Sequence, residues 1–348
     1  MAARVAILTP FASPSVRGNA ITAERIARGL RQRGVDLRLW DLSVVPETAV
    51  ENHIDRFRPA IVHAFHAFRT GPAALRIARR ANVPLLVTAT GTDVNHDLGD
   101  PDSAPVVRRV LEGAAAISVF DESMAAAIVE ALPDVAGRVV VIPQSVSFEA
   151  APHGHWPPAA ALRRATGPIV LFPAGLRSVK RPLLPLEPLE SLLPEHPGLE
   201  LVYVGPILDA EVGEVLAHAM ASQPWARHLG AVPHARMPAL LEASDVVLNC
   251  SISEGGMANS VLEALSLGRA VLASDIPGNR SLVEDGVSGL LFGSVEEMTA
   301  KARRLLADAD LRLRLGQAGR ERVATRFGPD REVDGYVAAY ARLSTVAP

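Results

Sequence analysis

Residues 246–273 have the sequence VVLNCSISEGGMANSVLEALSLGRAVLA, and this stretch decides the fold. Its first four residues form an apolar run of strand length that ends at Asn249. A glycine-containing loop follows, and the apolar spacing after Ser260 is typical of a helix. A second apolar run at 270–273 predicts another strand. A strand, a helix and a strand in this order indicate a parallel sheet that helices cover on both faces.

The same alternation of strands and helices extends over the whole chain. Apolar runs of strand length lie at 5–9, 35–39, 60–63, 85–88, 115–119, 139–142, 169–172, 199–204, 246–249 and 270–273. Helical spacing covers 20–30, 71–81, 183–193, 209–222, 236–243, 260–267, 295–307 and 329–344. We therefore expect an α/β protein whose ligands bind beyond the carboxyl ends of the strands.

Proline and glycine gather between residues 143 and 168, which predicts a linker between two domains. We expect an N-terminal Rossmann-like domain at 1–148, a linker at 149–168 and a C-terminal Rossmann-like domain at 169–328. The last helix, within 329–348, is expected to pack back toward the N-terminal domain. Two such domains would face each other across a cleft.

Composition excludes several classes of protein. The chain has 348 residues, 49% of them hydrophobic, and a formal net charge of −3, which does not suit a nucleic-acid-binding surface. Apolar runs are too short for a membrane span, and we expect a soluble, cytoplasmic protein. The single cysteine, Cys250, excludes disulfides within the chain and offers a labelling site.

The loop that contains Gly255 and Gly256 suits a diphosphate. Glycines allow the backbone to approach a ligand closely, and the amides at the start of the next helix face it. Glu254, at the strand end, is placed to accept hydrogen bonds from sugar hydroxyls. Glu263 has two interpretations of equal weight, a ligand contact or the far end of a capping box with Ser260. The residues that supply backbone contacts are Met257, Ala258, Asn259 and Ser260.

A second candidate loop lies at 173–182 and contains Arg177 and Lys180. Only two of the 35 basic residues are lysines, Lys180 and Lys301, so the other 33 are arginines. Two charged side chains in a surface loop usually belong to a solvated loop without a specific role. The rarity of lysine and the position after a strand favour a site that neutralises a leaving diphosphate, with Gly175 beside it.

Two loops of the first half supply the candidate acceptor side. Gly18, Asn19 and Thr22 lie at the start of the first helix, where Asn19 as an N-cap is the competing interpretation. The second loop follows the strand at 85–88 and holds Thr90, Gly91, Thr92, Asp93 and Asn95. Asp93 is a candidate base or acceptor-binding residue, with an Asx turn as the alternative.

Other patterns are weaker. His63 and His66 are expected to make buried hydrogen bonds rather than to bind metal. The Asp308-Ala-Asp310 sequence lies in helical, charged surroundings that indicate a solvated face. Sequences typical of zinc proteases, serine hydrolases and P-loop proteins do not occur in the chain.

Residues 251–292 strongly resemble the signature of the retaining, GT-B-fold glycosyltransferases of family 4. The similar segments are Glu254-Gly-Gly-Met-Ala-Asn, Leu262-Glu-Ala-Leu, Ile276-Pro-Gly-Asn279 and the stretch 283–292. Residues 141–143 and 61–63 with His66 are similar to the family's hinge and first-domain strand. Two subgroups resemble the chain most, the glycosyltransferase 1 domain-containing proteins and the selenosugar synthases of selenoneine biosynthesis.

This resemblance implies a transferase that moves a sugar from a nucleotide-sugar donor, with UDP-N-acetylglucosamine favoured, to a small-molecule acceptor. Selenophosphate is the acceptor in the selenosugar synthases. The nucleotide sugar is a substrate, and no cofactor or metal is implied. Arg177, Lys180, Glu254 and Asp93 would be catalytic and Glu263 would hold the ribose. Further donor contacts would come from Gly205 and from Val232 near the base, and Gln144 would join the acceptor side.

The sequence departs from the family at three positions. Thr90 stands where the family usually has histidine. Arg177 is displaced along its loop from the usual arginine position. Eight residues separate Glu254 from Glu263, one more than the family has, and Gly256 is the extra residue. The alternatives are a sugar-nucleotide epimerase or hydrolase, or a catalytically silent protein that binds a sugar nucleotide.

Overall fold

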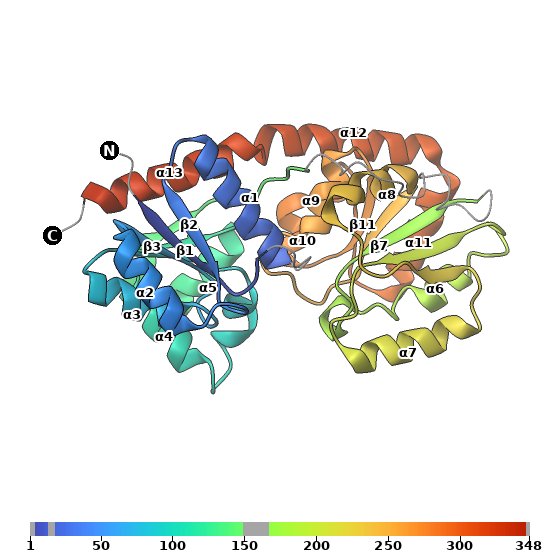
Figure 1. Cartoon of the computed structure of the whole chain (residues 1–348). Helices are drawn as coiled ribbons and strands as arrows, with labels where there is room; N and C mark the ends of the chain where they lie inside the picture. The colour runs from blue at the N-terminus through green and yellow to red at the C-terminus, as the bar shows by residue number, and fades with distance from the viewer. Residues whose placement is uncertain (1–3, 13–17, 149–166, 346–348) are drawn as a thin grey trace. The chain divides into compact units, whose positions relative to one another are not determined.

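The computed structural model describes residues 4–12, 18–148 and 167–345. These residues form two compact units (Figure 1). Unit 1 holds the chain up to residue 145, residues 255–257 and the chain from residue 328. Unit 2 holds residues 146–254 and 258–327. The predicted linker, 149–168, lies almost entirely outside the described residues.

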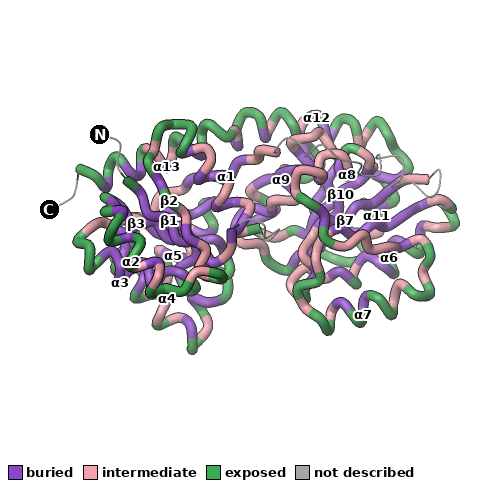
Figure 2. Tube along the Cα trace, in the orientation of Figure 1, coloured by how far each residue is buried: buried purple, intermediate pink, exposed green. Residues whose placement is uncertain are grey.

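Unit 1 is built on a parallel sheet with the strand order β2-β1-β3-β4-β5-β6. Its strands are β1 (Val5–Thr9), β2 (Leu37–Asp41), β3 (Ile61–Phe65), β4 (Leu85–Thr88), β5 (Ala116–Val119) and β6 (Val139–Val141). Its helices are α1 (Gly18–Gln32), α2 (Glu47–Phe57), α3 (Gly71–Ala81), η1 (Asp93–Asp97), α4 (Ala104–Gly113), α5 (Glu122–Ala131), η2 (Pro133–Arg138) and α13 (Pro329–Thr345). Strands β1, β3 and β4 are buried along their whole length because helices cover both faces (Figure 2).

Helix α13 is held in unit 1 by a buried ion pair. Arg25 of α1 donates from Nε and Nη2 to the two carboxylate oxygens of Glu332, at 3.0 and 2.8 Å. The hydroxyl of Ser145 donates to Glu332 at 2.6 Å. Both charged side chains are almost fully buried, so each depends on the other for the hydrogen bonds that replace water.

A polar cluster under α13 continues into the sheet. His63 of β3 hydrogen-bonds through its two ring nitrogens to the Tyr340 hydroxyl and to the Thr88 hydroxyl, both at 2.7 Å. Thr88 also contacts the hydroxyls of Ser118 at 2.6 Å and Tyr336 at 3.3 Å. Burial lowers the pKa of His63 to about 3, so the ring is neutral in the folded chain. The structural interpretation of His63 is therefore confirmed.

Unit 2 has a second parallel sheet, with the order β12-β11-β10-β7-β8-β9. Its strands are β7 (Ile169–Pro173), β8 (Glu200–Val204), β9 (Ala226–His228), β10 (Val246–Asn249), β11 (Ala270–Ser274) and β12 (Leu290–Phe292). Its helices are η4 (Ser178–Lys180), α6 (Leu186–Glu190), α7 (Ala210–Ala221), η5 (His234–Arg236), α8 (Met237–Ala243), α9 (Asn259–Ser266), α10 (Pro277–Leu282), α11 (Val295–Ala307) and α12 (Ala309–Arg326).

The two sheets confirm the predicted parallel α/β class, and every strand run found in the sequence corresponds to a strand. Asp308 accepts a hydrogen bond from the Leu311 amide and is the N-cap of α12. The Asp308-Ala-Asp310 sequence is therefore a helix start, which agrees with its non-metal interpretation. Among the described residues, none of the helices combines the length and the apolar character that crossing a bilayer requires.

Replacing Glu332 should destabilise unit 1. Glu332→Ala leaves the Arg25 guanidinium buried and without its carboxylate, and the expected loss is about 3–5 kcal/mol of unfolding free energy. Urea unfolding followed by circular dichroism measures it. Asp334→Ala is the matched control, because Asp334 lies on the same helix and its ion pair with Arg33 is exposed. The control should lose under about 1 kcal/mol. Equal losses in the two variants would contradict the assigned role of the buried pair.

Acid should weaken the folded chain through His63. The unfolded histidine takes up a proton near pH 6.5, whereas the folded one does so only near pH 3. The unfolding free energy should therefore be unaffected by His63 above pH 6.5. As the pH falls from 6.5 toward 3, it should drop by up to about 1.4 kcal/mol per pH unit. In His63→Gln this part of the slope should vanish, while His96→Gln, at an exposed site, should keep it. Urea titrations at stepwise pH give both slopes.

Candidate functional site

The candidate site of unit 2 lies at the carboxyl ends of its central strands. Strands β7 and β10 are parallel neighbours, so the loops that follow them start at the same edge of the sheet. Lys180 comes from the first loop and Glu254 from the second. The Lys180 ammonium donates to both carboxylate oxygens of Glu254, each at 2.6 Å. The structure thus joins two residues that the sequence placed in separate loops, 74 positions apart.

Glu254 is held by other donors as well. The Asn249 side-chain amide and the Ser251 hydroxyl donate to its Oε1 atom, at 2.8 and 2.6 Å. Burial opposes ionisation of this carboxyl, but Lys180 and the hydrogen bonds outweigh burial and hold the pKa of Glu254 below its usual value. Glu254 is therefore an ionised acceptor at neutral pH, suited to receive hydrogen bonds and unsuited to supply a proton.

A buried amide supports this arrangement from α10. Asn279 is fully buried, and its side-chain amide donates to the Asn249 side-chain oxygen at 3.2 Å and to the Ser274 carbonyl at 2.9 Å. Asn249 in turn contacts Glu254. Asn249 and Ser251 were not among the predicted site residues. Their position, with Asn249 as the last residue of a buried apolar strand and Ser251 just after it, is the signal that could have identified them.

The β7 and β10 loops are also joined through their backbones. The Ile252 amide donates to the Val179 carbonyl at 2.9 Å, and Arg181 donates from Nε to the Cys250 carbonyl at 2.7 Å. Arg181 has a left-handed backbone, with φ 46°. The Cys250 thiol is fully buried, and burial raises its pKa. The expectation that Cys250 offers a labelling site is wrong.

Arg177 differs from Lys180 in exposure. Its backbone is extended and its side chain is exposed, whereas Lys180 is half-buried. Gly175 and Gly205 lie at the ends of the neighbouring strands β7 and β8. A side chain at Gly205 would come within 2.0 Å of the Ala174 carbonyl, and its φ of 138° also requires glycine. Gly205 therefore lets the two loops approach each other.

Glu263 of α9 contacts a histidine that the sequence did not single out. His234 hydrogen-bonds through Nε2 to Glu263 at 2.8 Å, and the Phe148 ring stacks on the His234 ring at 5.7 Å between centroids. Helix α9 begins at Asn259, after Ala258, so the capping box between Ser260 and Glu263 is not formed. The capping interpretation of Glu263 is wrong. Val232, two residues before His234, is buried.

The glycine loop leads directly into α9. Gly256 has φ 100°, a conformation that glycine adopts readily. Met257 and Ala258 are buried, and Asn259 and Ser260 are half-buried in the first turn. Because Ala258 at the N-cap has no polar side chain, it cannot cap the first amides of α9. Gly255 also belongs to this loop.

Unit 1 carries the other predicted residues at the carboxyl ends of its strands. Asp93, at the start of η1, is fully buried and accepts hydrogen bonds from the amides of Ala67, Thr90 and Gly91, at 2.7, 3.0 and 2.7 Å. His66 lies 3.8 Å from the same carboxylate. Because the Asp93 carboxylate accepts hydrogen bonds from three backbone amides, it stabilises the loop conformation. This supports the Asx-turn interpretation of Asp93 rather than a role as general base. Thr92 and Asn95 are exposed at this loop.

Two further unit 1 residues contact each other. The Gln144 side-chain amide donates to the Thr22 hydroxyl at 3.1 Å, and both residues are buried. Asn19 lies inside α1, which already includes Gly18, so Asn19 is not the N-cap of that helix. The Thr90 hydroxyl, at the position of the family's histidine, is buried without a hydrogen-bond partner among the described residues. Those residues also contain no cluster of three or more metal-binding side chains.

Both halves of the chain are similar to known protein families. Residues 158–322 match the family of glycosyl transferases group 1, and residues 2–150 match Glycosyltransferase Family 4. Glycosyltransferase 1 domain-containing protein 1 of Xenopus tropicalis is 26% identical over 329 residues, which cover 92% of each chain.

Solved structures show the same fold. Sucrose-phosphate synthase of Thermosynechococcus elongatus superposes with a TM-score of 0.82, 19% identity and 99% coverage of both chains. HepE of Anabaena, solved in complex with UDP and glucose, superposes with a TM-score of 0.78, 16% identity and coverage of 97% of this chain and 99% of its own. The two matched segments together span most of the sequence, so both halves of the chain resemble glycosyltransferases and the fold is that of the GT-B type.

Proposed function

We propose that the protein is a retaining, metal-independent glycosyltransferase that uses a UDP-sugar, with UDP-N-acetylglucosamine favoured, and a small-molecule acceptor. The observation that carries this proposal is the Lys180–Glu254 pair beside the glycine loop and the first turn of α9. It combines a cation, an ionised acceptor and backbone donors at one edge of a sheet. HepE, with the same fold, was solved with UDP and glucose, which supports a UDP-sugar as donor.

Each predicted donor-side group has a role in this proposal. The Lys180 ammonium and the amides after Glu254 stabilise the charge that develops on the leaving diphosphate, and Arg177 adds a second cation from its exposed loop. The ionised Glu254 accepts hydrogen bonds from sugar hydroxyls. Glu263 holds the ribose, and the backbone near Val232 contacts the base. Gly175 and Gly205 let backbone approach the donor. Two cations take the part that a divalent metal plays in other transferases.

The transfer itself needs no carboxylate nucleophile. Because Asp93 is occupied by three amides, it suits neither a nucleophile nor a base. We propose front-face attack, in which the bond from the anomeric carbon to the diphosphate breaks as the acceptor oxygen binds to the same face. The acceptor proton passes to an oxygen of the departing diphosphate. The configuration at the anomeric carbon is then retained.

The acceptor is proposed to contact unit 1. Gly18, Asn19, Thr22 and Gln144 form one group there, and Thr90, Gly91, Thr92 and Asn95 form another. A cytoplasmic location suits a nucleotide-sugar donor. Selenophosphate is a second candidate acceptor, which the resemblance to selenosugar synthases favours.

Mass spectrometry of reactions with UDP-sugars and a panel of small acceptors, including selenophosphate, tests the reaction class. Formation of UDP together with a glycosylated acceptor of unchanged anomeric configuration supports the proposal. Loss of UDP-sugar without an acceptor would instead identify an epimerase or hydrolase. Binding without turnover would identify a silent sugar-nucleotide-binding protein, in which Thr90 does not replace the family's histidine.

Lys180→Ala should lower turnover by about 10²–10³-fold, because one charge-stabilising donor is lost at the leaving group. Initial rates of UDP release measure the effect. Lys301→Ala is the matched control, since Lys301 is the other lysine of the chain and lies on α11. Glu254→Gln should lower turnover as well, and its combination with Lys180→Ala should be less than additive because the two side chains share one contact. Unchanged rates in both single variants would refute the donor-site assignment.

Glu263→Ala should weaken UDP binding by about tenfold or more, because it removes a charged acceptor for the ribose hydroxyls. Isothermal titration calorimetry with UDP and with 2′,3′-dideoxy-UDP separates this role from a folding defect. Affinity for the dideoxy compound should change little. Glu242→Ala, at an exposed position of the same unit, provides the control. An equal loss for both nucleotides would show that Glu263 does not act on the ribose.

A further inference from the structure

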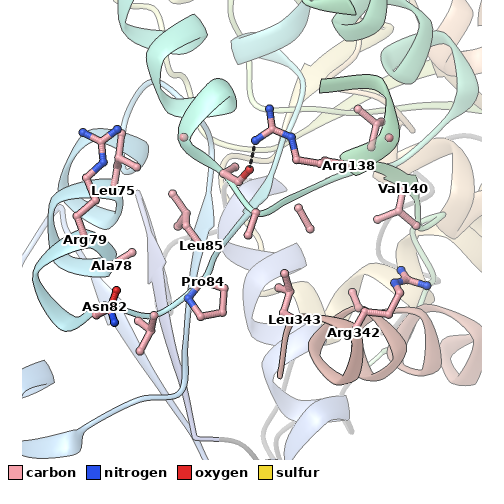
Figure 3. Close-up of a pocket in the computed structure, with 18 residues that line it drawn as sticks. Leu75, Ala78, Arg79, Asn82, Pro84, Leu85, Arg138, Val140, Arg342 and Leu343 are labelled. Atoms are coloured by element: carbon pink, nitrogen blue, oxygen red, sulfur yellow. Dashed lines mark hydrogen bonds between the residues drawn. The ribbon is translucent and has the colours of Figure 1, made fainter. Parts of the chain in front are cut away.

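Unit 1 contains a cavity of about 770 Å³ at the edge of its sheet where the strands begin, away from the edge that carries its predicted acceptor residues. Its lining includes the residues where β4, β5 and β6 begin, Leu85, Ala116 and Val139. Thr90 and Asp93, by contrast, follow the carboxyl end of β4. We call this space the amino-edge cavity (Figure 3). Its volume is in the range of small-molecule sites.

The wall of the amino-edge cavity combines apolar and polar surface. The ends of three helices contribute to it, with Leu75 and Ala78 from α3, Gly113 from α4 and Leu343 from α13. Val83, Pro84, Val139 and Val140 are only half-buried, so apolar side chains remain accessible there. A bound molecule with an apolar body would remove this surface from water.

Arginines supply all the charge in this lining. Arg79, Arg138 and Arg342 come from three different elements, and no aspartate or glutamate lines the cavity (Figure 3). The other arginines of α3 differ, because Arg76 and Arg80 form ion pairs with carboxylates of α2. Three positive charges in one partly apolar hollow favour an anion over a neutral or cationic molecule.

Helix ends offer a structural explanation for all three arginines, because Arg79 and Arg342 lie in the last turns of α3 and α13. Basic residues near the last turn of a helix also offset its negative end. Arg138 acts in this way, since its Nη1 atom donates to the carbonyls of Glu112 and Ala114 at the end of α4, at 2.8 and 2.6 Å. The guanidinium groups of Arg79 and Arg342 make no hydrogen bond or ion pair with any residue in the described part of the chain. Their charges remain available to a ligand.

We propose that the amino-edge cavity is a second ligand site, which binds an organic anion with an apolar body and a single carboxylate, phosphate or sulfonate group. The apolar body lies against the half-buried valines. Arg79 and Arg342 lie at opposite sides of the cavity in Figure 3, so the anionic group binds one guanidinium directly, through charge-assisted hydrogen bonds, and is attracted by the charge of the other. The site shares no residue with the proposed donor pair, because Lys180 and Glu254 belong to unit 2.

Fluorescence titration of the full chain with two dyes tests this proposal. The probes are 8-anilinonaphthalene-1-sulfonate, which is an anion, and the neutral N-phenyl-1-naphthylamine. Excess UDP is present throughout, so that a nucleotide site does not contribute. The anionic dye should bind at one site per chain and about tenfold more tightly than the neutral dye. Decanoate should displace it, whereas decanol should not.

Substitutions locate the site. Arg79→Ala and Arg342→Ala should each reduce affinity for the anionic dye severalfold and leave the neutral dye unaffected. Arg76→Ala is the matched control, since Arg76 lies on α3 but is absent from the lining. Thermal unfolding verifies that the variants fold, as expected for exposed side chains. Equal affinity for the two dyes, or anionic-dye binding that is the same in both arginine variants as in the unaltered chain, would overturn the proposal.

Discussion

All strands in the two described sheets run parallel to their neighbours, and this constraint determines where polar chemistry can occur. Helices cover both faces of such a sheet, so side chains along β1, β3, β7 and β10 are buried. Charged and polar groups that contact a ligand can therefore lie only at the two edges of the sheet where the strands begin or end. In unit 2 the carboxyl edge holds the Lys180–Glu254 pair. In unit 1 the two edges carry different chemistry, with a hydrogen-bonded loop at one and an arginine-lined cavity at the other.

Most of the architecture could be predicted from the sequence, because buried parallel strands are continuous apolar runs. Strands β1, β4 and β10 have the predicted bounds. Strands β9 and β12 were not predicted: β9 has the sequence Ala-Arg-His, which is not an apolar run, and β12 is a run of only three apolar residues, shorter than the four at 139–142. Helix α12 was also missed, because its apolar residues do not gather on one face. Its N-cap, Asp308, lay instead in a pattern that resembles a metal-binding sequence.

The candidate site was predicted in part. Lys180 and Glu254 were predicted because they follow the ends of strands. The sequence could not show that they form one ion pair, because the order of strands along the chain does not give their order in the sheet. Glu263 shows the opposite limit. Its spacing from Ser260 fits a capping box, yet the helix begins one residue before Ser260. The Glu263 carboxylate hydrogen-bonds to His234 instead. Short polar patterns do not determine partners that come from distant segments, and Arg25 with Glu332, 307 positions apart, is the extreme case.

The burial of Cys250 has a practical consequence. Its thiol lies beneath the β7 and β10 loops, fully covered, and its raised pKa keeps it in the unreactive protonated form. The folded chain therefore behaves toward maleimides and mild oxidants almost as a cysteine-free protein. A pair of cysteines introduced on the surface, one in each unit, would be the only reactive sulfurs under native conditions. Spectroscopic probes attached there would report the distance between the two units in solution without replacement of the native residue.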